Sequence, residues 1–275
     1  MSDILKIAGV QFEPFAETTL SVSQACELIR VASSKGAKII SLSQLFANRW
    51  FPSTIDKDKF SLAEQEDGFI ITTLRELALD EGITLIAPIF EKAQTENGDE
   101  YFNTAFVIGT KGEIIGKYRK LHIPQLPLWE EKSYFKKGDL GLPVFESNGV
   151  KFGVLLCWDV FYPDAFRTLS EKGAQIVFAP TASAYYHARH KWERAIQASS
   201  HVNGLFTFRV NRVGKEDKQA FYGRSFCVAP DGEFILKPSG PSEGIVLADI
   251  QLKDIDTVRR EWAFAKERSK EDYTS

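Results

Sequence analysis

Short apolar segments alternate with longer segments of helical periodicity along the chain. Runs of apolar and β-branched residues predict strands at residues 4–12, 37–43, 83–90, 150–156, 174–179, 205–210 and 245–250. Apolar residues at helical spacing predict helices at residues 22–34, 68–81, 162–172, 187–202 and 252–262. Such alternation is typical of an α/β protein built around a mixed sheet.

Two predicted hairpins and one long loop interrupt this alternation. The hairpins join residues 103–108 to 114–118 and residues 225–229 to 233–236, each through a turn that contains glycine. Residues 121–143 show no clean period and contain three prolines and two glycines, which indicates a long functional loop. Two layers of sheet flanked by helices would suit this number of strands. We expect one domain at residues 1–265, followed by a charged tail at 266–275.

Composition places the chain among ordinary globular proteins. It has 275 residues, of which 44% are apolar and 26% charged, and its formal net charge of −3 does not indicate a nucleic-acid-binding surface. No apolar run approaches the roughly 18 residues of a membrane span, and the first residues have the pattern of a strand rather than of a signal peptide. Three cysteines are too few for a disulfide framework, which favours a reducing, cytoplasmic setting.

The segment GVLLCWDVFYP, residues 153–163, carries the sharpest chemical signal in the chain. A buried strand runs directly into Cys157, and a helix that opens with Pro163 follows. This frame is similar to a nucleophile elbow, in which free backbone N–H groups and a helix N-terminus would lower the thiol pKa and bind an oxyanion. A buried structural cysteine is the alternative, and we favour it for Cys26 and Cys227, which lie within an apolar helix stripe and a strand.

A cysteine nucleophile needs a base and a group that stabilises charge. None of the four histidines lies in a telling local pattern: His122, His187, His190 and His201. His187 and His190 are one helical turn apart, as in a metal-binding pair, but no third ligand is evident. Solvated positions on a helix are the better explanation for this pair.

A denser cluster of charged residues occupies residues 116–139. Strand alternation at its start places Lys120 on one face and Arg119 on the other. Glu130 and Glu131 follow in the irregular loop. Aromatic residues and prolines are interleaved with these charges, which indicates a packed segment rather than a solvated charge run.

These motifs together resemble one known family. YRKLHIP, EKSYFKKGD and LLCWDVFYPD are similar to motifs of the nitrilase superfamily of carbon–nitrogen hydrolases. The resemblance continues through YFNTAFVIG, APTAS, HKWERAIQASSHVNGLF, NRVG and FYGRSFCVAPDGE, and so covers nearly the whole chain in order. The CWD, EK-YF--GD and FYG-SF elements look most like the N-carbamoylputrescine amidase branch.

The resemblance implies a four-layer αββα sandwich of two mixed sheets flanked by helices. It also implies a cysteine-dependent hydrolase of non-peptide C–N bonds that acts on amides or N-carbamoyl amines through a thioester acyl-enzyme. The nucleophile matches Cys157, the lysine matches Lys120 and an additional glutamate matches Glu131, while the backbone N–H of Trp158 would join Lys120 in holding the oxyanion. The family pattern predicts no metal or organic cofactor, and assembly into homodimers or larger homo-oligomers.

At one catalytic position the chain departs from the family pattern. The family has a glutamate followed by Leu-Phe at the end of the second strand, whereas this chain has Gln44 before Leu45-Phe46. An amide can form hydrogen bonds but cannot carry the proton, and loss of a general base typically costs about 10²–10⁴ in rate. We expect an impaired hydrolase that can trap its acyl-enzyme, whether the substitution is natural or deliberate. Glu91, near another strand end, is the alternative base.

Several candidates for substrate binding lie near these motifs. Aromatic residues would form apolar walls around a small amide, or would pack the sandwich edge or an oligomer interface: Trp50, Trp129, Trp158 and Tyr185. Asp159 and Glu130 are candidates to receive a cationic tail such as that of a carbamoyl-polyamine, and a structural or solvated role is an equally good interpretation of both. The competing functions are a nitrilase acting on small nitriles, a Cys–His peptidase or transferase that depends on His122, and an inactive pseudoenzyme that binds a metabolite or a partner.

Overall fold

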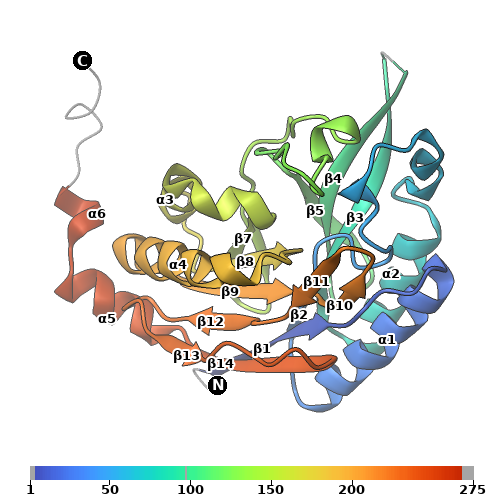
Figure 1. The fold of residues 1–275 in the computed structure, drawn as a ribbon. Coiled ribbons are helices and arrows are strands. Elements are labelled where there is room, and N and C mark those ends of the chain that lie inside the picture. Colours follow the sequence, from blue (N-terminus) through green and yellow to red (C-terminus); the bar gives the residue numbers. More distant parts are fainter. Residues whose placement is uncertain (1–3, 97, 268–275) are drawn as a thin grey trace.

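Two six-stranded mixed sheets form the centre of the molecule (Figure 1). The computed structural model describes residues 4–96 and 98–267. In the first sheet the strand order is β14 (Gly244–Gln251), β1 (Ile4–Gln11), β2 (Ile39–Leu42), β3 (Thr84–Thr95), β4 (Gly98–Ile108) and β5 (Ile114–Arg119). β1, β2 and β3 run parallel, and the other neighbours pair antiparallel.

The second sheet has the same plan of a parallel centre and antiparallel edges. Its order is β13 (Phe234–Leu236), β12 (Phe226–Val228), β9 (Phe206–Asn211), β8 (Ile176–Thr181), β7 (Val150–Val154) and β6 (Phe145–Ser147). The parallel strands are β7, β8 and β9. A separate antiparallel ribbon consists of β10 (Val213–Glu216) and β11 (Gln219–Tyr222).

Alternation along the strands divides the apolar side chains into three layers. Val10 of β1 packs in a cluster with residues of α1 (Thr18–Ser34) and α2 (Phe69–Glu81). Ile7 of the same strand points to the other face, where it joins Phe208 of β9 between the two sheets. The first sheet is therefore covered by helices on one face and by the second sheet on the other.

The outer face of the second sheet is covered in the same way. Val177 and Ala179 of β8 pack with residues of α3 (Pro163–Glu171) and α4 (Arg189–Asn203). Two further helices, α5 (Lys253–Glu261) and α6 (Phe264–Glu267), follow β14. Helix, sheet, sheet and helix thus form four layers, which confirms the predicted αββα sandwich.

Each predicted helix and strand overlaps one in the structure, but three strands were not predicted. These are β6, β10 and β11, and β3 and β4 also extend beyond their apolar cores to form a long hairpin. The missed segments are short or rich in charged residues, so their pattern resembles that of a loop. None of the described helices is long and apolar enough to cross a lipid bilayer. The charged tail predicted at 266–275 lies outside the described residues from 268 onward, and the boundary at 265 stays a prediction.

Close approach of the two sheets depends on a glycine in β1. A Cβ added at Gly9 would lie 2.6 Å from Cγ2 of Val210 in β9 and 3.0 Å from Cγ2 of Val246 in β14. Both distances are shorter than ordinary contact between methyl groups. Gly9 therefore lets β1 lie directly against β9 at the centre of the sandwich.

We predict that Gly9→Ala lowers the free energy of unfolding by about 1–3 kcal/mol, because the added methyl group overpacks a filled core. Urea unfolding of the variant measures this loss. Adding Val210→Ala removes two of the three methyl groups that the new Cβ meets, so the double variant should lose less than the sum of the two single losses. Strict additivity would contradict this account of the contact between the sheets.

Candidate active site

The four predicted catalytic residues lie just after strands or at the start of a short turn. Gln44 follows β2, Lys120 follows β5, and Cys157 comes shortly after β7, while Glu131 begins the 3₁₀ turn Glu131–Ser133. The backbone N–H of Gln44 donates to the carbonyl of Thr181 at the end of β8, 3.4 Å away, which joins the two sheets at this edge. The carboxyl ends of parallel strands are the usual binding edge of α/β sheets.

Cys157 occupies a strained turn. It begins the 3₁₀ turn Cys157–Phe161 with a φ of 51°, a left-handed conformation that is uncommon for any residue except glycine. Its side chain is almost fully buried, and its Sγ lies 3.9 Å from the carbonyl oxygen of Ala182, to which it donates a weak hydrogen bond. A short turn of this kind, rather than α3, carries the cysteine.

The environment of Cys157 favours the neutral thiol. Burial raises the pKa of Cys157 to about 11, although Lys120 acts to lower it. The sequence-based prediction of a lowered thiol pKa is therefore wrong for the unliganded site. It was wrong because desolvation of a fully buried sulfur outweighs the nearby cation.

Lys120 and Glu131 form an ion pair that is fully buried. The distance from Lys120 Nζ to Glu131 Oε2 is 2.6 Å, and both side chains are 0% exposed. Burial raises the pKa of Glu131, which Lys120 opposes. Burial acts to lower the pKa of Lys120, but Glu131, with Cys157 and Asp159, raises it above its ordinary value. The lysine is thus held as a cation.

Gln44 lies beside this pair with an unsatisfied amide. Its side chain is fully buried, and among the described residues neither Nε2 nor Oε1 has a partner at hydrogen-bonding distance and angle. It is close enough to Glu131 to contribute slightly to lowering the pKa of that carboxyl. The next residue, Leu45, has a φ of 52°, so a second strained turn directs Gln44. A buried amide without a partner costs free energy of folding, so this position is suited to contact with a ligand or to a different side chain.

Asp159 fastens the lysine segment to the cysteine turn. Its carboxylate accepts hydrogen bonds from the Tyr118 hydroxyl at 2.7 Å and the Leu156 N–H at 2.9 Å. It also accepts from the N–H of His122 at 3.0 Å, and the His122 ring nitrogen Nδ1 lies 2.7 Å away. Because Asp159 is fully buried and engaged in this way, it is not a receptor for a substrate's cationic tail, which corrects that prediction.

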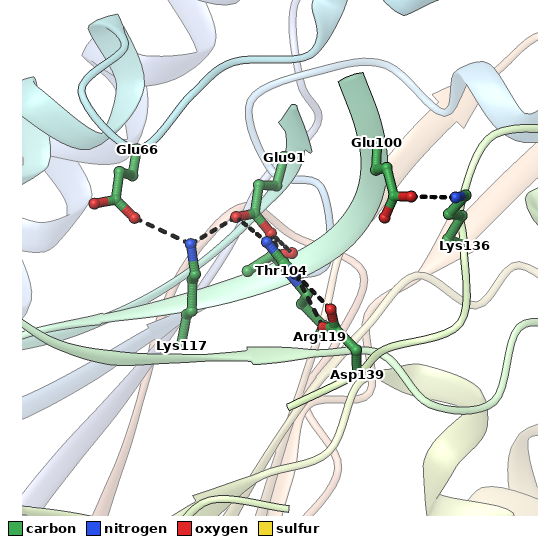
Figure 2. A network of polar contacts seen from close by, with 8 residues as sticks. All are labelled: Glu66, Glu91, Glu100, Thr104, Lys117, Arg119, Lys136 and Asp139. Carbon is green, nitrogen blue, oxygen red and sulfur yellow. Dashed lines mark hydrogen bonds and ion pairs between the residues drawn. The ribbon is translucent and has the colours of Figure 1, made fainter. Parts of the chain in front are cut away.

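Arg119 is the last residue of β5 and points to the face of this strand opposite to Lys120. Its ion pairs anchor the strand there (Figure 2). Its guanidinium donates to both carboxylate oxygens of Glu91, at 2.7 and 2.8 Å, and to Asp139 at 2.9 Å. Lys117 and Thr104 also bind Glu91. These partners hold the Glu91 pKa below its ordinary value despite burial, so Glu91 is occupied as a structural anion and is not placed to act as the alternative base.

A cavity of about 450 Å³ opens beside Cys157. Three of the aromatic residues predicted to bind substrate line it: Trp129, Trp158 and Tyr185. Trp50 does not; it packs behind Trp129, with ring centroids 6.2 Å apart, and its indole N–H donates to the Leu128 carbonyl. The structure thus places Trp50 as a support for the cavity wall.

The side chains of His187 and His190 have contacts other than Cys157. His190 contacts Glu193 through Nδ1 at 2.9 Å, and His187 packs near the Tyr185 ring. The described residues contain no cluster of three or more potential metal ligands. Cys26 and Cys227 lie in the apolar cores, as their sequence positions indicate.

Comparison with known proteins decides the family. A model of the carbon-nitrogen hydrolase family matches residues 6–260. The chain belongs to this family. An N-carbamoylputrescine amidase of Arabidopsis thaliana is 32% identical over 277 residues, which span 95% of this chain and 91% of that protein. A nitrilase of Pyrococcus abyssi is 34% identical over 251 residues, which span 90% of each.

A solved structure agrees with this assignment. The crystal structure of a carbon-nitrogen hydrolase from Helicobacter pylori G27 has a TM-score of 0.93 and 30% identity, with coverage of 98% of this chain and 97% of that one. The predicted membership of the nitrilase superfamily, with a likeness to N-carbamoylputrescine amidases, is confirmed.

Two residues of this hydrolase that contact or act on the site were not predicted. The side-chain amide of Asn103 in β4 donates a hydrogen bond to Glu131 at 3.5 Å, and its backbone carbonyl accepts one from the backbone N–H of Lys120 at 2.9 Å. A polar residue inside the apolar run YFNTAF was an available signal for it. Arg209 in β9 is fully buried and acts to lower the pKa of Cys157. Its contacts depend on α4 and the segment after β11, so sequence pattern alone did not reveal it.

We predict that Arg119→Met lowers the free energy of unfolding by about 3 kcal/mol, because Glu91 loses its main partner while remaining buried. Lys136→Met is the matched control, since the Lys136 side chain is 60% exposed in its pair with Glu100 (Figure 2). The control should cost at most about 1 kcal/mol. Urea unfolding compares the two, and equal losses would contradict an anchoring role for Arg119.

The pH dependence of Cys157 alkylation provides a second test. Because the thiol keeps its proton up to a pKa of about 11, its reaction with iodoacetamide should still rise steeply between pH 9 and pH 11. A small free thiol, with a pKa of about 8.5, should by then be near its plateau. Peptide mass mapping separates Cys157 from Cys26 and Cys227. A plateau for Cys157 below pH 9 would show that the site stabilises the thiolate.

Proposed function

We propose that this chain is a cysteine-dependent hydrolase of a small linear amide or N-carbamoyl amine, working through a thioester and impaired by Gln44. The observation that carries the proposal is the buried Lys120–Glu131 pair beside Cys157, with the partnerless Gln44 amide next to it. The likeness to N-carbamoylputrescine amidases supports the substrate class. The family assignment supports hydrolysis of a C–N bond.

In the proposed acylation step, Cys157 Sγ attacks the carbonyl carbon of the substrate and forms a C–S bond. The developing oxyanion is held by the Lys120 ammonium and the backbone N–H of Trp158. Collapse of the tetrahedral species breaks the C–N bond, and the nitrogen leaves after taking up the proton that the thiol released. Since the resting thiol is neutral, this proton must be moved during attack, with Glu131 as the available carboxylate.

In the proposed deacylation step, water attacks the thioester and Cys157 is released. A carboxylate at position 44 would accept the proton from this water, whereas the Gln44 amide can only orient the water through a hydrogen bond. Hydrolysis of the thioester should therefore suffer more than its formation. The chain should accumulate acyl-enzyme with a reactive amide.

We predict that Gln44→Glu raises the rate of ammonia release by about 10²–10⁴ over the chain as it stands. The panel comprises N-carbamoyl amines, N-carbamoyl acids, ω-amides and nitriles, with both chains assayed in parallel. Intact-mass spectra of the Gln44 chain should show an added acyl group, and Cys157→Ala should abolish it. Absence of both an adduct and a gain of turnover would overturn the proposal.

Two other functions are distinguished by the same experiment. A nitrilase would release ammonia only from the nitriles, and a nitrilase relative supports keeping this candidate. A pseudoenzyme would stay inactive with Gln44→Glu; the absence of a carboxylate at that position favours it. A Cys–His enzyme would lose activity with His122→Ala but keep it with Lys120→Ala, the reverse of our expectation.

Other features of the proposal rest on the sequence. Assembly into a homodimer or a larger homo-oligomer, a cytoplasmic setting and a single hydrolase domain over residues 1–265 stay predictions. Size-exclusion chromatography with light scattering addresses the first of these directly.

A further inference from the structure

The cavity beside Cys157 carries positive charge and no carboxylate. Its walls are mainly apolar, with Leu126, Phe161 and Trp192 among them. The charged or titratable groups besides Cys157 and Tyr185 are His187 and Lys191, and none of the described residues that line the cavity is Asp or Glu. Lys191 lies exposed on α4, and within the described part of the chain it forms no salt bridge. Its ammonium group is therefore available to a ligand.

A second cation lies behind the cavity wall. Arg209 is fully buried, and its guanidinium carbon lies 4.9 Å from the ring centroid of Trp192, which lines the cavity. Its hydrogen bonds go to neutral oxygens, namely the Gly223 and Arg224 carbonyls and the Tyr222 hydroxyl, and its Nε has no partner. A buried cation without a carboxylate in direct contact makes the local potential positive, and low-dielectric surroundings extend its effect.

The acidic residues near the cavity are committed to other partners. Glu193 binds Arg224 at 2.9 Å and His190 at 2.9 Å. Glu130 accepts a hydrogen bond from Gln125 and does not line the cavity. With Asp159 fully buried in its own hydrogen bonds, no acidic side chain of the described wall is left to receive an ammonium group.

We propose that the substrate of this site has an apolar body and an anionic, carboxylate end that Lys191 receives, and that polyamine-like cationic tails are disfavoured. This inference rests on the proposed function, because it assumes that the reacting amide lies at Cys157. Lys191 determines specificity by its charge, and Arg209 supports it from behind the wall. The chain thereby differs in selectivity from a hydrolase of carbamoyl-polyamines.

The test uses three linear primary amides of similar length: glutaramate, pentanamide and 5-aminopentanamide. These end in a carboxylate, a methyl group and an ammonium group. Their equilibrium binding to the full chain is followed by tryptophan fluorescence, since Trp129, Trp158 and Trp192 line the cavity. This measurement does not require turnover. We expect glutaramate to bind about tenfold more tightly than 5-aminopentanamide, with pentanamide between them, and the difference to shrink at high salt.

Two charge reversals on α4 separate a local effect from a general one. Lys191→Glu should abolish or reverse the preference for glutaramate, a change of about tenfold or more in the ratio of dissociation constants. Arg194→Glu makes the same change in net charge at an exposed position that does not line the cavity, and should change the ratio less than about twofold. Equal effects of the two variants, or tighter binding of 5-aminopentanamide by the unaltered chain, would overturn the inference.

Failure of this inference and failure of the proposed function give different results. If Gln44→Glu releases ammonia without regard to the charge of the tail, the hydrolase proposal stands and the specificity proposal fails. If the charge preference is present in binding but no amide is hydrolysed or forms an adduct, the cavity selects anions in a protein that is not a hydrolase.

Discussion

The buried ion pair between Lys120 and Glu131 is the interaction on which the rest of the site depends. Both side chains are completely removed from water. Desolvation costs several kcal/mol for each ion, and the attraction between the two ions offsets this cost only if their geometry is well fixed. The surrounding contacts provide that geometry. The Asn103 side chain donates to Glu131, and its backbone carbonyl accepts the backbone N–H of Lys120. Asp159 ties the segment after β5 to the cysteine turn. The Arg119–Glu91 pair secures the strand from its opposite face.

The same architecture explains why the nucleophile is a neutral thiol in the unliganded site. Complete burial penalises the thiolate more than Lys120 and Arg209 together favour it, and Glu131 adds further opposition. A neutral thiol must lose its proton as it attacks, so the chemistry needs a proton acceptor close by. In the proposed mechanism the Gln44 amide cannot serve as that acceptor, whereas Lys120 and Cys157 are both in place.

The charge balance links the glutamine to the choice of substrate. With an amide at position 44, the region around Cys157 holds the Lys120–Glu131 ion pair and the buried Arg209, whose hydrogen bonds go to neutral oxygens. The cavity next to it has Lys191 on its wall and no carboxylate. A carboxylate-ended substrate would offset part of the positive charge of Lys191 and Arg209, whereas a cationic tail would add to it. The reacting end and the distal end of the site therefore favour the same class of ligand.

Much of the fold followed from patterns that are local in the chain. Period-two and helical spacing gave nearly all the large elements, because each buries one face against a neighbouring layer. The strands missed, β10 and β11 among them, are only three or four residues long, and they form because a partner segment supplies their hydrogen bonds. Local pattern singled out Cys157, and the resemblance to the nitrilase superfamily implied Lys120, Glu131 and Gln44 as its partners in a common site.

The sequence by itself thus determined the layered α/β class, the family and the identity of the candidate catalytic groups, since these depend on residue type and order. Only the tertiary structure decided the raised pKa of the Cys157 thiol and the structural roles of Asp159 and Glu91. It also decided that Trp50 does not line the cavity and that the cavity wall carries positive charge. These properties depend on burial and on distances between residues far apart in the chain. The burial of these side chains and their pairing with other groups are established only when the two sheets pack together, so no local sequence pattern predicts them.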